Sequence, residues 1–84
     1  MIVFMSRCFC LIETAQGKSI EVINCLKKLE GVDSVDAVTG PYDVIMVANT
    51  RNLNDISELV GVKVHEIPHV TRTVTCLSIA SSTR

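Results

Sequence analysis

The stretch VDSVDAVTGPYDVIMVAN (residues 32–49) is the most informative part of the sequence, because it predicts two strands of different character on either side of a turn. Residues 32–39 form a short and rather polar run, which suits the edge of a sheet. Residues 42–49 contain the run VIMV, which is apolar on both faces of a strand and favours a central position. Gly40 and Pro41 separate the two runs. We therefore expect a β-hairpin that joins an edge strand to a central strand.

The residues before this hairpin predict a second central strand and a helix. The segment RCFCLIET (residues 7–14) is almost continuously apolar, as in a strand buried on both faces, and residues 2–4 are a candidate extension of it. After a short turn, the apolar residues of an amphipathic helix recur at three-residue steps: Ile20, Ile23, Leu26 and Leu29. Lys27 and Lys28 then oppose the negative end of the helix dipole, and Gly31 ends the helix.

The residues after the hairpin predict a second helix and a last strand. Asn52 can cap a helix whose apolar stripe consists of Leu53, Ile56, Leu59, Val60, Val64 and Ile67. Gly61 and the β-branched valines lower the helix propensity of its second half, and Pro68 ends it. In VTRTVTCLSIA (residues 70–80), the alternation of a strand places one set of side chains on a common face: Thr71, Thr73, Thr75, Leu77 and Ile79.

The order strand, helix, strand, strand, helix, strand predicts one architecture. Two intercalated β-α-β units with right-handed crossovers form a four-stranded antiparallel sheet with both helices on one face, which is the ferredoxin-like α+β fold. The first and third strands are then central, and the second is an edge strand. The central strands are apolar on both faces, so the face without helices needs a cover that the chain does not contain. We expect a second copy to provide it, in a symmetric dimer that forms an α/β sandwich packed sheet to sheet.

Length and composition limit the class of protein. A chain of 84 residues with 48% hydrophobic and 20% charged side chains indicates one globular domain over residues 1–84. The net charge of −1 argues against a surface for nucleic acid or for an anionic membrane. No apolar run is long enough for a signal peptide or a spanning helix, so we expect a cytoplasmic protein. In that compartment the four cysteines are best interpreted as small buried hydrophobes: Cys8, Cys10, Cys25 and Cys76.

The segment HEIPH (residues 65–69) matches the zinc-protease pattern H-E-x-x-H, which places two histidine ligands on one helical face. We reject a metal site here, because Pro68 lacks an N–H and clashes with the carbonyl group of Val64, so the helix cannot continue to His69. The chain has no third histidine to complete a ligand set. No catalytic triad or glycine-rich phosphate loop can be named either. We therefore expect no enzyme, no metal and no cofactor.

The segment TGPYD (residues 39–43) is the candidate binding site. Gly40 and Pro41 are residues that a turn requires, but Asp43 lies at the start of a strand that we otherwise expect to be buried. Its carboxylate therefore needs a partner, either a neighbouring hydroxyl or the ammonium group of a ligand. Backbone N–H groups of the turn and the hydroxyls of Thr73 and Thr75 can bind a carboxylate. Together these groups suit a small zwitterion.

Over about residues 7–80, the chain resembles the ligand-binding (RAM) domain of the leucine-responsive and asparagine-responsive regulator family, Lrp/AsnC. The similarity lies in a strand ending in ET that is followed by GK and a helix, in the segment LKKLEGVDSVDAVTGPYDVIMVA, and in a helix ending in IP before the strand VTRTVTCL. The turn G-x-Y-D after a strand ending in VT is the most specific part.

The resemblance implies ferredoxin-like domains that form homodimers through their sheets, assemble into higher homo-oligomers, and bind free amino acids in clefts between dimers. Carried over position by position, the binding site consists of Gly40, Tyr42, Asp43, Thr73 and Thr75. Full-length Lrp/AsnC regulators are further expected partners.

Two departures from the family stand out. The family usually has glycine after the IP pair, where this chain has His69, so the geometry of that turn is open. Family regulators also carry an N-terminal helix-turn-helix, whereas only six residues precede the first strand here. We therefore expect a stand-alone sensor without direct nucleic-acid contacts.

Three functions are compatible with these residues. The leading hypothesis is a regulatory module that binds an amino acid or a related small metabolite at an oligomer interface and modulates transcription regulators through assembly. The first alternative is a purely structural oligomerisation module with an empty cleft. The second is a small dimeric enzyme of the ferredoxin-like type, which needs a catalytic His or Asp facing an internal cavity. Neither His65 nor His69 is placed for that role.

Overall fold

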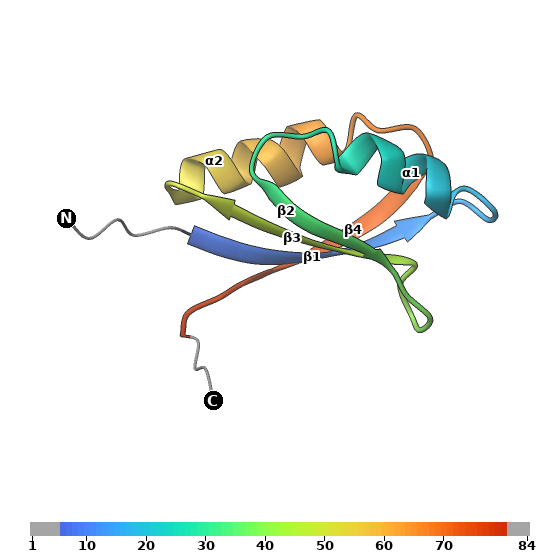
Figure 1. The fold of residues 1–84 in the computed structure, drawn as a ribbon, viewed down its shortest axis with the longest axis horizontal. Helices are drawn as coiled ribbons and strands as arrows, with labels where there is room; N and C mark the ends of the chain where they lie inside the picture. The colour runs from blue at the N-terminus through green and yellow to red at the C-terminus, as the bar shows by residue number, and fades with distance from the viewer. Residues whose placement is uncertain (1–5, 81–84) are drawn as a thin grey trace.

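The computed structural model describes residues 6–80, which form two layers, with the helices on one side of a sheet (Figure 1). In chain order the elements are β1 (Ser6–Thr14), α1 (Ser19–Leu26), β2 (Val32–Ala37), β3 (Val44–Thr50), α2 (Leu53–Glu58), the π-helix η1 (Leu59–Val64) and β4 (Val70–Leu77). The strand order is β2-β3-β1-β4, and all neighbours are antiparallel. The ferredoxin-like fold is thus confirmed, with the second strand at an edge. The candidate extension over residues 2–4 lies outside the described residues.

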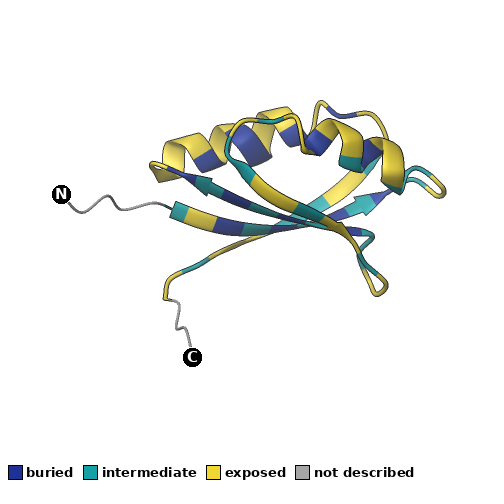
Figure 2. Ribbon diagram, in the orientation of Figure 1, coloured by how far each residue is buried: buried dark blue, intermediate teal, exposed yellow. Residues whose placement is uncertain are grey.

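The core lies between the helices and the sheet (Figure 2). Alternate residues of both central strands are fully buried on the helix side: Cys8, Cys10, Ile12, Val44, Met46 and Ala48. The helical segments cover them with six further apolar residues: Val22, Leu26, Ile56, Leu59, Val60 and Val64. Because strand side chains alternate, the residues between these in β1 and β3 point to the other face of the sheet.

The first helix is shorter than expected and presents a different face to the sheet. Its buried residues are Val22 and Leu26, whereas Ile20 is 66% exposed. The predicted stripe is therefore wrong at Ile20, because steps of three residues fall behind the helical period of 3.6 residues. Two other members of that stripe, Ile23 and Leu29, lie half-buried at the margin of the core.

Gly31 lies directly before β2 and does not end α1. The helix ends at Leu26, and Lys27 is its C-cap, so the predicted lysines lie after the last turn. Gly31 has φ +93°, and its carbonyl oxygen accepts the N–H of Asn49 at 2.8 Å. A Cβ at Gly31 would lie 3.3 Å from the carbonyl oxygen of Asn49. Glycine is needed here for both its conformation and its small size.

The second helix begins as predicted and then changes type. Oδ1 of Asn52 accepts the backbone N–H of Asp55 at 2.9 Å, which caps α2. Leu53 is 58% exposed, contrary to the predicted stripe, since side chains tilt toward the helix N-terminus and that of the first residue points past its end. Around Gly61, where the helix propensity is low, the chain forms the π-helix η1. No helix within residues 6–80 is long and apolar enough to cross a membrane.

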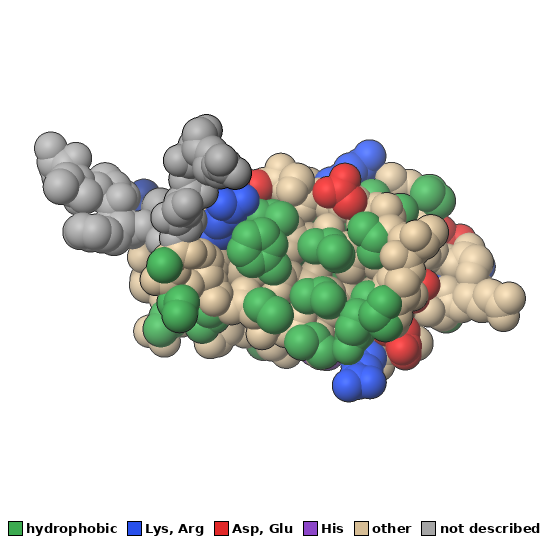
Figure 3. All heavy atoms as spheres, turned by 90° about the horizontal axis from the view of Figure 1, so that it is seen from below, with side chains coloured by type: hydrophobic (Ala, Val, Ile, Leu, Met, Phe, Trp, Pro, Cys, Tyr) green, Lys and Arg blue, Asp and Glu red, His purple; other side chains and the backbone are tan. Residues whose placement is uncertain are grey.

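The sheet face opposite the helices is apolar, and no other element of residues 6–80 covers it (Figure 3). Its centre consists of six residues that lie opposite one another in the strand register, here called the open sheet face: Phe9, Leu11, Ile45, Val47, Val74 and Cys76. Charged side chains gather at the margin of this area. Apolar positions on both faces of β1 and β3 were expected from the sequence, and the structure places the second set here.

Candidate functional site

Backbone hydrogen bonds hold the candidate turn against the sheet. Gly40 has φ +147°, a conformation that residues with a Cβ rarely adopt. The N–H of Val38 donates to the carbonyl oxygen of Asp43 at 2.9 Å, and the N–H of Asp43 donates to the carbonyl oxygen of Ile12 at 3.0 Å. Tyr42 and Asp43 are half-buried, whereas Gly40 is exposed. The turn therefore has a defined shape and an accessible tip.

The carboxylate of Asp43 has a partner within the protomer. Its Oδ2 accepts the backbone N–H of Thr14 at 2.8 Å. This corrects the expectation that a hydroxyl or a ligand's ammonium group would be the partner. The register between β1 and β3 ends at Ile12, so the N–H of Thr14 lies beyond the ladder and needs another acceptor.

Thr73 and Thr75 lie on the helix-facing side of β4, and both hydroxyls also have partners. Oγ1 of Thr73 lies 3.1 Å from Nε2 of His65. Oγ1 of Thr75 donates to Sγ of Cys10 at 3.9 Å. β4 ends at Leu77, so the predicted continuation of this face to Ile79 is wrong, and Ile79 is 99% exposed.

β1 separates the turn from the two threonines. Asp43 is hydrogen-bonded to Ile12 at one edge of β1, and Thr73 is the partner of Ile12 at the other edge. Neighbouring strands lie about 4.8 Å apart, so Asp43 and Thr73 are separated by about 10 Å. The structure thus brings the three turn residues together and the two threonines together. It does not join the two groups within one protomer.

The HEIPH segment has no metal-site geometry. η1 ends at Val64, so no helix runs through the motif, as predicted. His65 and His69 are exposed and have different neighbours, since Nε2 of His69 lies 3.6 Å from Oε2 of Glu21 while His65 contacts Thr73. Within residues 6–80, no three His, Cys, Asp or Glu side chains are grouped as a metal would require.

The four cysteines fall into two classes. Cys8 and Cys10 are fully buried, as predicted. Burial raises the pKa of both thiols, that of Cys10 to about 11, so both stay neutral and unreactive at neutral pH. Cys25 and Cys76 are exposed, contrary to expectation, because Cys25 lies off the buried side of α1 and Cys76 belongs to the open sheet face.

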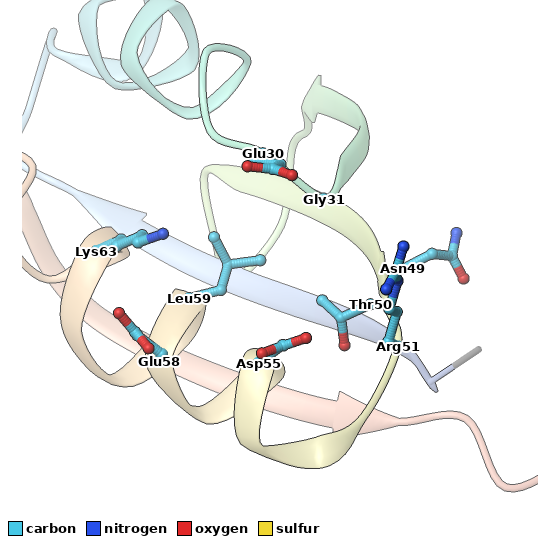
Figure 4. Close-up of a pocket in the computed structure, with 9 residues that line it drawn as sticks. All are labelled: Glu30, Gly31, Asn49, Thr50, Arg51, Asp55, Glu58, Leu59 and Lys63. Atoms are coloured by element: carbon cyan, nitrogen blue, oxygen red, sulfur yellow. The ribbon is translucent and has the colours of Figure 1, made fainter. Parts of the chain in front are cut away.

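A cavity of about 420 Å³ lies at the far end of β3, between the helical segment α2–η1 and the loop of Glu30 and Gly31 (Figure 4). This β3 cavity is lined by Glu30, Gly31, Asn49, Thr50, Arg51, Asp55, Glu58, Leu59 and Lys63. Leu59 points into it from the helix, and charged side chains surround it. Because β3 has seven residues, about 20 Å of strand separates the cavity from the turn at residues 40–43.

Three residues at steps of four line the β3 cavity from the helical side: Asp55 in α2, and Leu59 and Lys63 in η1. Side chains four positions apart are neighbours on a helix surface. Val62 is 49% exposed and does not line the cavity. The weak helix propensity around Gly61 was the one sequence signal that the second half of this helix is irregular.

The walls of the β3 cavity are held by hydrogen bonds that do not use its charged groups. The hydroxyl of Thr50 donates to the carbonyl oxygen of Asn52 at 2.8 Å, and the amide of Asn49 donates to the carboxylate of Asp33. In the described part of the chain, five charged side chains around the cavity form no ion pair and no side-chain hydrogen bond: Glu30, Arg51, Asp55, Glu58 and Lys63. Sequence reasoning missed this site, because its walls come from three separate segments.

A family model for the Lrp/AsnC ligand binding domain matches residues 7–83. The chain belongs to this family. The resemblance inferred from the G-x-Y-D turn and its flanking strands is therefore confirmed. No curated protein sequence matches the chain. As an Lrp/AsnC ligand-binding domain, it is a regulatory effector-binding domain.

Solved structures share this Lrp/AsnC domain fold. TTHA0845 from Thermus thermophilus has a TM-score of 0.88 at 24% identity, covering 94% of this chain and 99% of that chain. The hypothetical protein PHS023 from Pyrococcus horikoshii has a TM-score of 0.83 at 30% identity, covering 90% and 92%. The regulator NMB0573 from Neisseria meningitidis, solved as an L-Met complex, has a TM-score of 0.83 at 17% identity. The match covers 94% of this chain and 53% of the regulator.

His69 occupies the Lrp/AsnC position where glycine was expected, and it adopts a glycine-like backbone. Its φ is +75°, in the left-handed region that costs free energy for residues with a Cβ. Its carbonyl oxygen accepts the N–H of Ala15 at 2.8 Å, which fixes the turn before β4. The turn therefore has a defined geometry, in which histidine adopts a conformation that glycine adopts more easily.

Proposed function

We propose that this chain is a sensor that binds an amino acid or a related small metabolite at an interface between its own copies, and that binding changes the assembly of transcription regulators. The observation that carries the proposal is the match of residues 7–83 to a ligand-binding domain of a regulator family. The L-Met complex of NMB0573 supports the choice of ligand class. Full-length Lrp/AsnC regulators in the cytoplasm are the proposed further partners.

A homodimer packed through the open sheet face is the first step of the proposed assembly. Phe9 lies opposite Val47 and Cys76, and Leu11 lies opposite Ile45 and Val74. A continuous apolar area of this kind favours association, because contact with a second copy removes it from water. The two-fold symmetry of such a dimer would place the same side chains on both sides of the interface.

The proposed ligand site combines Gly40, Tyr42 and Asp43 of one copy with Thr73 and Thr75 of another. Within one protomer, β1 holds these two groups about 10 Å apart, so a shared ligand requires a contact between copies. Backbone N–H groups of the turn and threonine hydroxyls would bind the carboxylate of an amino acid, and Asp43 would bind its ammonium group. Asp43 has capacity for this, since an ionised carboxylate accepts several hydrogen bonds.

Native mass spectrometry of the purified protein combined with thermal shifts for the twenty amino acids tests the proposal. We expect a dimer or a higher even-numbered oligomer, and stabilisation by about 2.7 kcal/mol for an amino acid at 100 times its dissociation constant. Tyr42→Phe should reduce the shift, and Ile20→Ala, on the exposed side of α1, is the matched control. A folded monomer that responds to no amino acid would refute the proposal.

A structural oligomerisation module is the second candidate. The observation in its favour is that Asp43, Thr73 and Thr75 already have partners within the protomer. This candidate predicts the same dimer with no thermal shift for any amino acid.

A further inference from the structure

We propose that the β3 cavity is a second ligand site and that it binds a diamino acid, a small molecule with two ammonium groups and one carboxylate. This site goes beyond the proposed function, because it lies within one protomer and about 20 Å of strand away from the turn at residues 40–43. Its volume of about 420 Å³ is sufficient for a small molecule.

The charges around the cavity determine the ligand class. Three carboxylates and two cations surround it: Glu30, Asp55 and Glu58 with Arg51 and Lys63. Carboxylates bind ammonium groups and cations bind a carboxylate, both through charge-assisted hydrogen bonds. A molecule with two ammonium groups and one carboxylate balances the single excess negative charge of this set.

The positions of these groups suit such a molecule (Figure 4). Asp55 and Glu58 project from α2 along one side of the cavity, and Glu30 lies on the loop across it. Lys63 and Arg51 lie at opposite ends, so either can receive the carboxylate of the ligand. The side chain of Leu59 provides an apolar floor for the methylene groups between the ligand's charges.

The cavity is prepared for binding before a ligand arrives. Its walls are fixed by the bonds from Asn49 to Gly31 and from Thr50 to Asn52. Fixed walls reduce the ordering cost of binding. The charged groups, in contrast, form no ion pair within residues 6–80, so a ligand does not have to break one.

The test titrates ¹⁵N-labelled protein with L-lysine and three analogues that differ by one group. L-norleucine lacks the side-chain ammonium, cadaverine lacks the carboxylate, and L-2-aminoadipate has a carboxylate in place of the terminal CH₂NH₃⁺ group. We expect L-lysine to shift the amide resonances of residues 31, 49–51 and 55–59. It should bind about tenfold or more tightly than each analogue, because every analogue loses charge-assisted hydrogen bonds. Equal binding of L-lysine and L-norleucine, or shifts confined to residues 40–43, would overturn the proposal.

Matched variants separate the cavity from general charge effects. Glu58→Gln removes one exposed carboxylate from the cavity, and the double substitution Arg51→Met with Lys63→Met removes both of its cations. Each variant should weaken L-lysine binding by about tenfold. Glu66→Gln and Lys28→Met remove exposed charges outside it and should leave binding unchanged. Equal weakening by both pairs would refute a defined site. Tyr42→Phe should affect only ligands of the turn, so failure of one site is distinguishable from failure of the other.

Discussion

Oδ2 of Asp43 accepts the backbone N–H of Thr14 over 2.8 Å, and this bond ties the turn before β3 to the last residue of β1. The side chain that the sequence marks as the ammonium ligand of a bound amino acid therefore has a structural role as well. The two roles can be separated by substitution, because stability depends on an acceptor oxygen and ammonium binding depends on charge.

Asp43→Ala should lower the free energy of unfolding by about 1–3 kcal/mol, because the part-buried N–H of Thr14 loses its acceptor. Asp43→Asn keeps an acceptor oxygen and should lose about 1 kcal/mol or less. Urea unfolding measures both values, with the slope against denaturant unchanged. Wild-type stability in Asp43→Ala would contradict the structural role. Loss of amino-acid binding in a stable Asp43→Asn protein would show that the negative charge of Asp43 is needed to bind the ligand.

Leu11→Lys should dissociate the proposed dimer. Leu11 lies at the centre of the open sheet face, with Ile45 on one side and Val74 on the other. A charge at the centre of an apolar interface should weaken association by about 30-fold or more. Sedimentation velocity at several concentrations measures this change. Ile20→Lys, on the exposed side of α1, should leave the dimer intact, and an intact dimer in Leu11→Lys would exclude sheet-to-sheet packing.

The stability of the protein should fall between about pH 9 and 11. Burial raises the pKa of the Cys10 thiol from 9.0 to about 11, so in this range the unfolded chain loses a proton that the folded protein keeps. The contribution of Cys10 is fully present below pH 9, and up to about 3 kcal/mol is lost as the pH rises to 11. Urea unfolding across this range measures the decline.

Substitutions of single cysteines test which thiol causes the fall in stability at alkaline pH. Cys10→Ala should flatten the pH dependence even though it lowers stability at neutral pH by leaving a cavity. Cys25→Ala, at an exposed position, is the control and should retain the decline. An identical slope in Cys10→Ala and wild type would mean that other groups cause it.

His69→Gly should be more stable than His69→Ala by about 1 kcal/mol, because glycine adopts φ +75° without the steric cost that a Cβ brings. Both variants lack the imidazole near Glu21, so their difference isolates the backbone conformation. Thermal and urea unfolding give the two values. Equal stability of the two variants would show that the turn has relaxed from the left-handed conformation.

Residue pattern was sufficient to predict the layers of this fold. The apolar runs around Phe9 and Met46 predicted central strands, and the polar run around Ser34 predicted an edge strand. These predictions were possible because the polarity of alternate residues in a strand indicates which of its two faces are buried. The Asn52 cap was equally local, since donor and acceptor are three residues apart. Exposure at the helix ends was harder to predict, as Ile20 and Leu53 show, because it depends on how each helix crosses the sheet.

The order of elements, the apolar set of each strand and the G-x-Y-D turn follow from residue pattern alone, since each of these is encoded within a few neighbouring residues. Three features became apparent only in the folded chain: the bond between Thr14 and Asp43, the separation of Asp43 from Thr73 by β1, and the charged residues of three segments around the β3 cavity. They depend on strand register and on the packing of helices against the sheet, which bring distant segments together. Periodicity reports whether a residue is buried, but not which residue lies across from it.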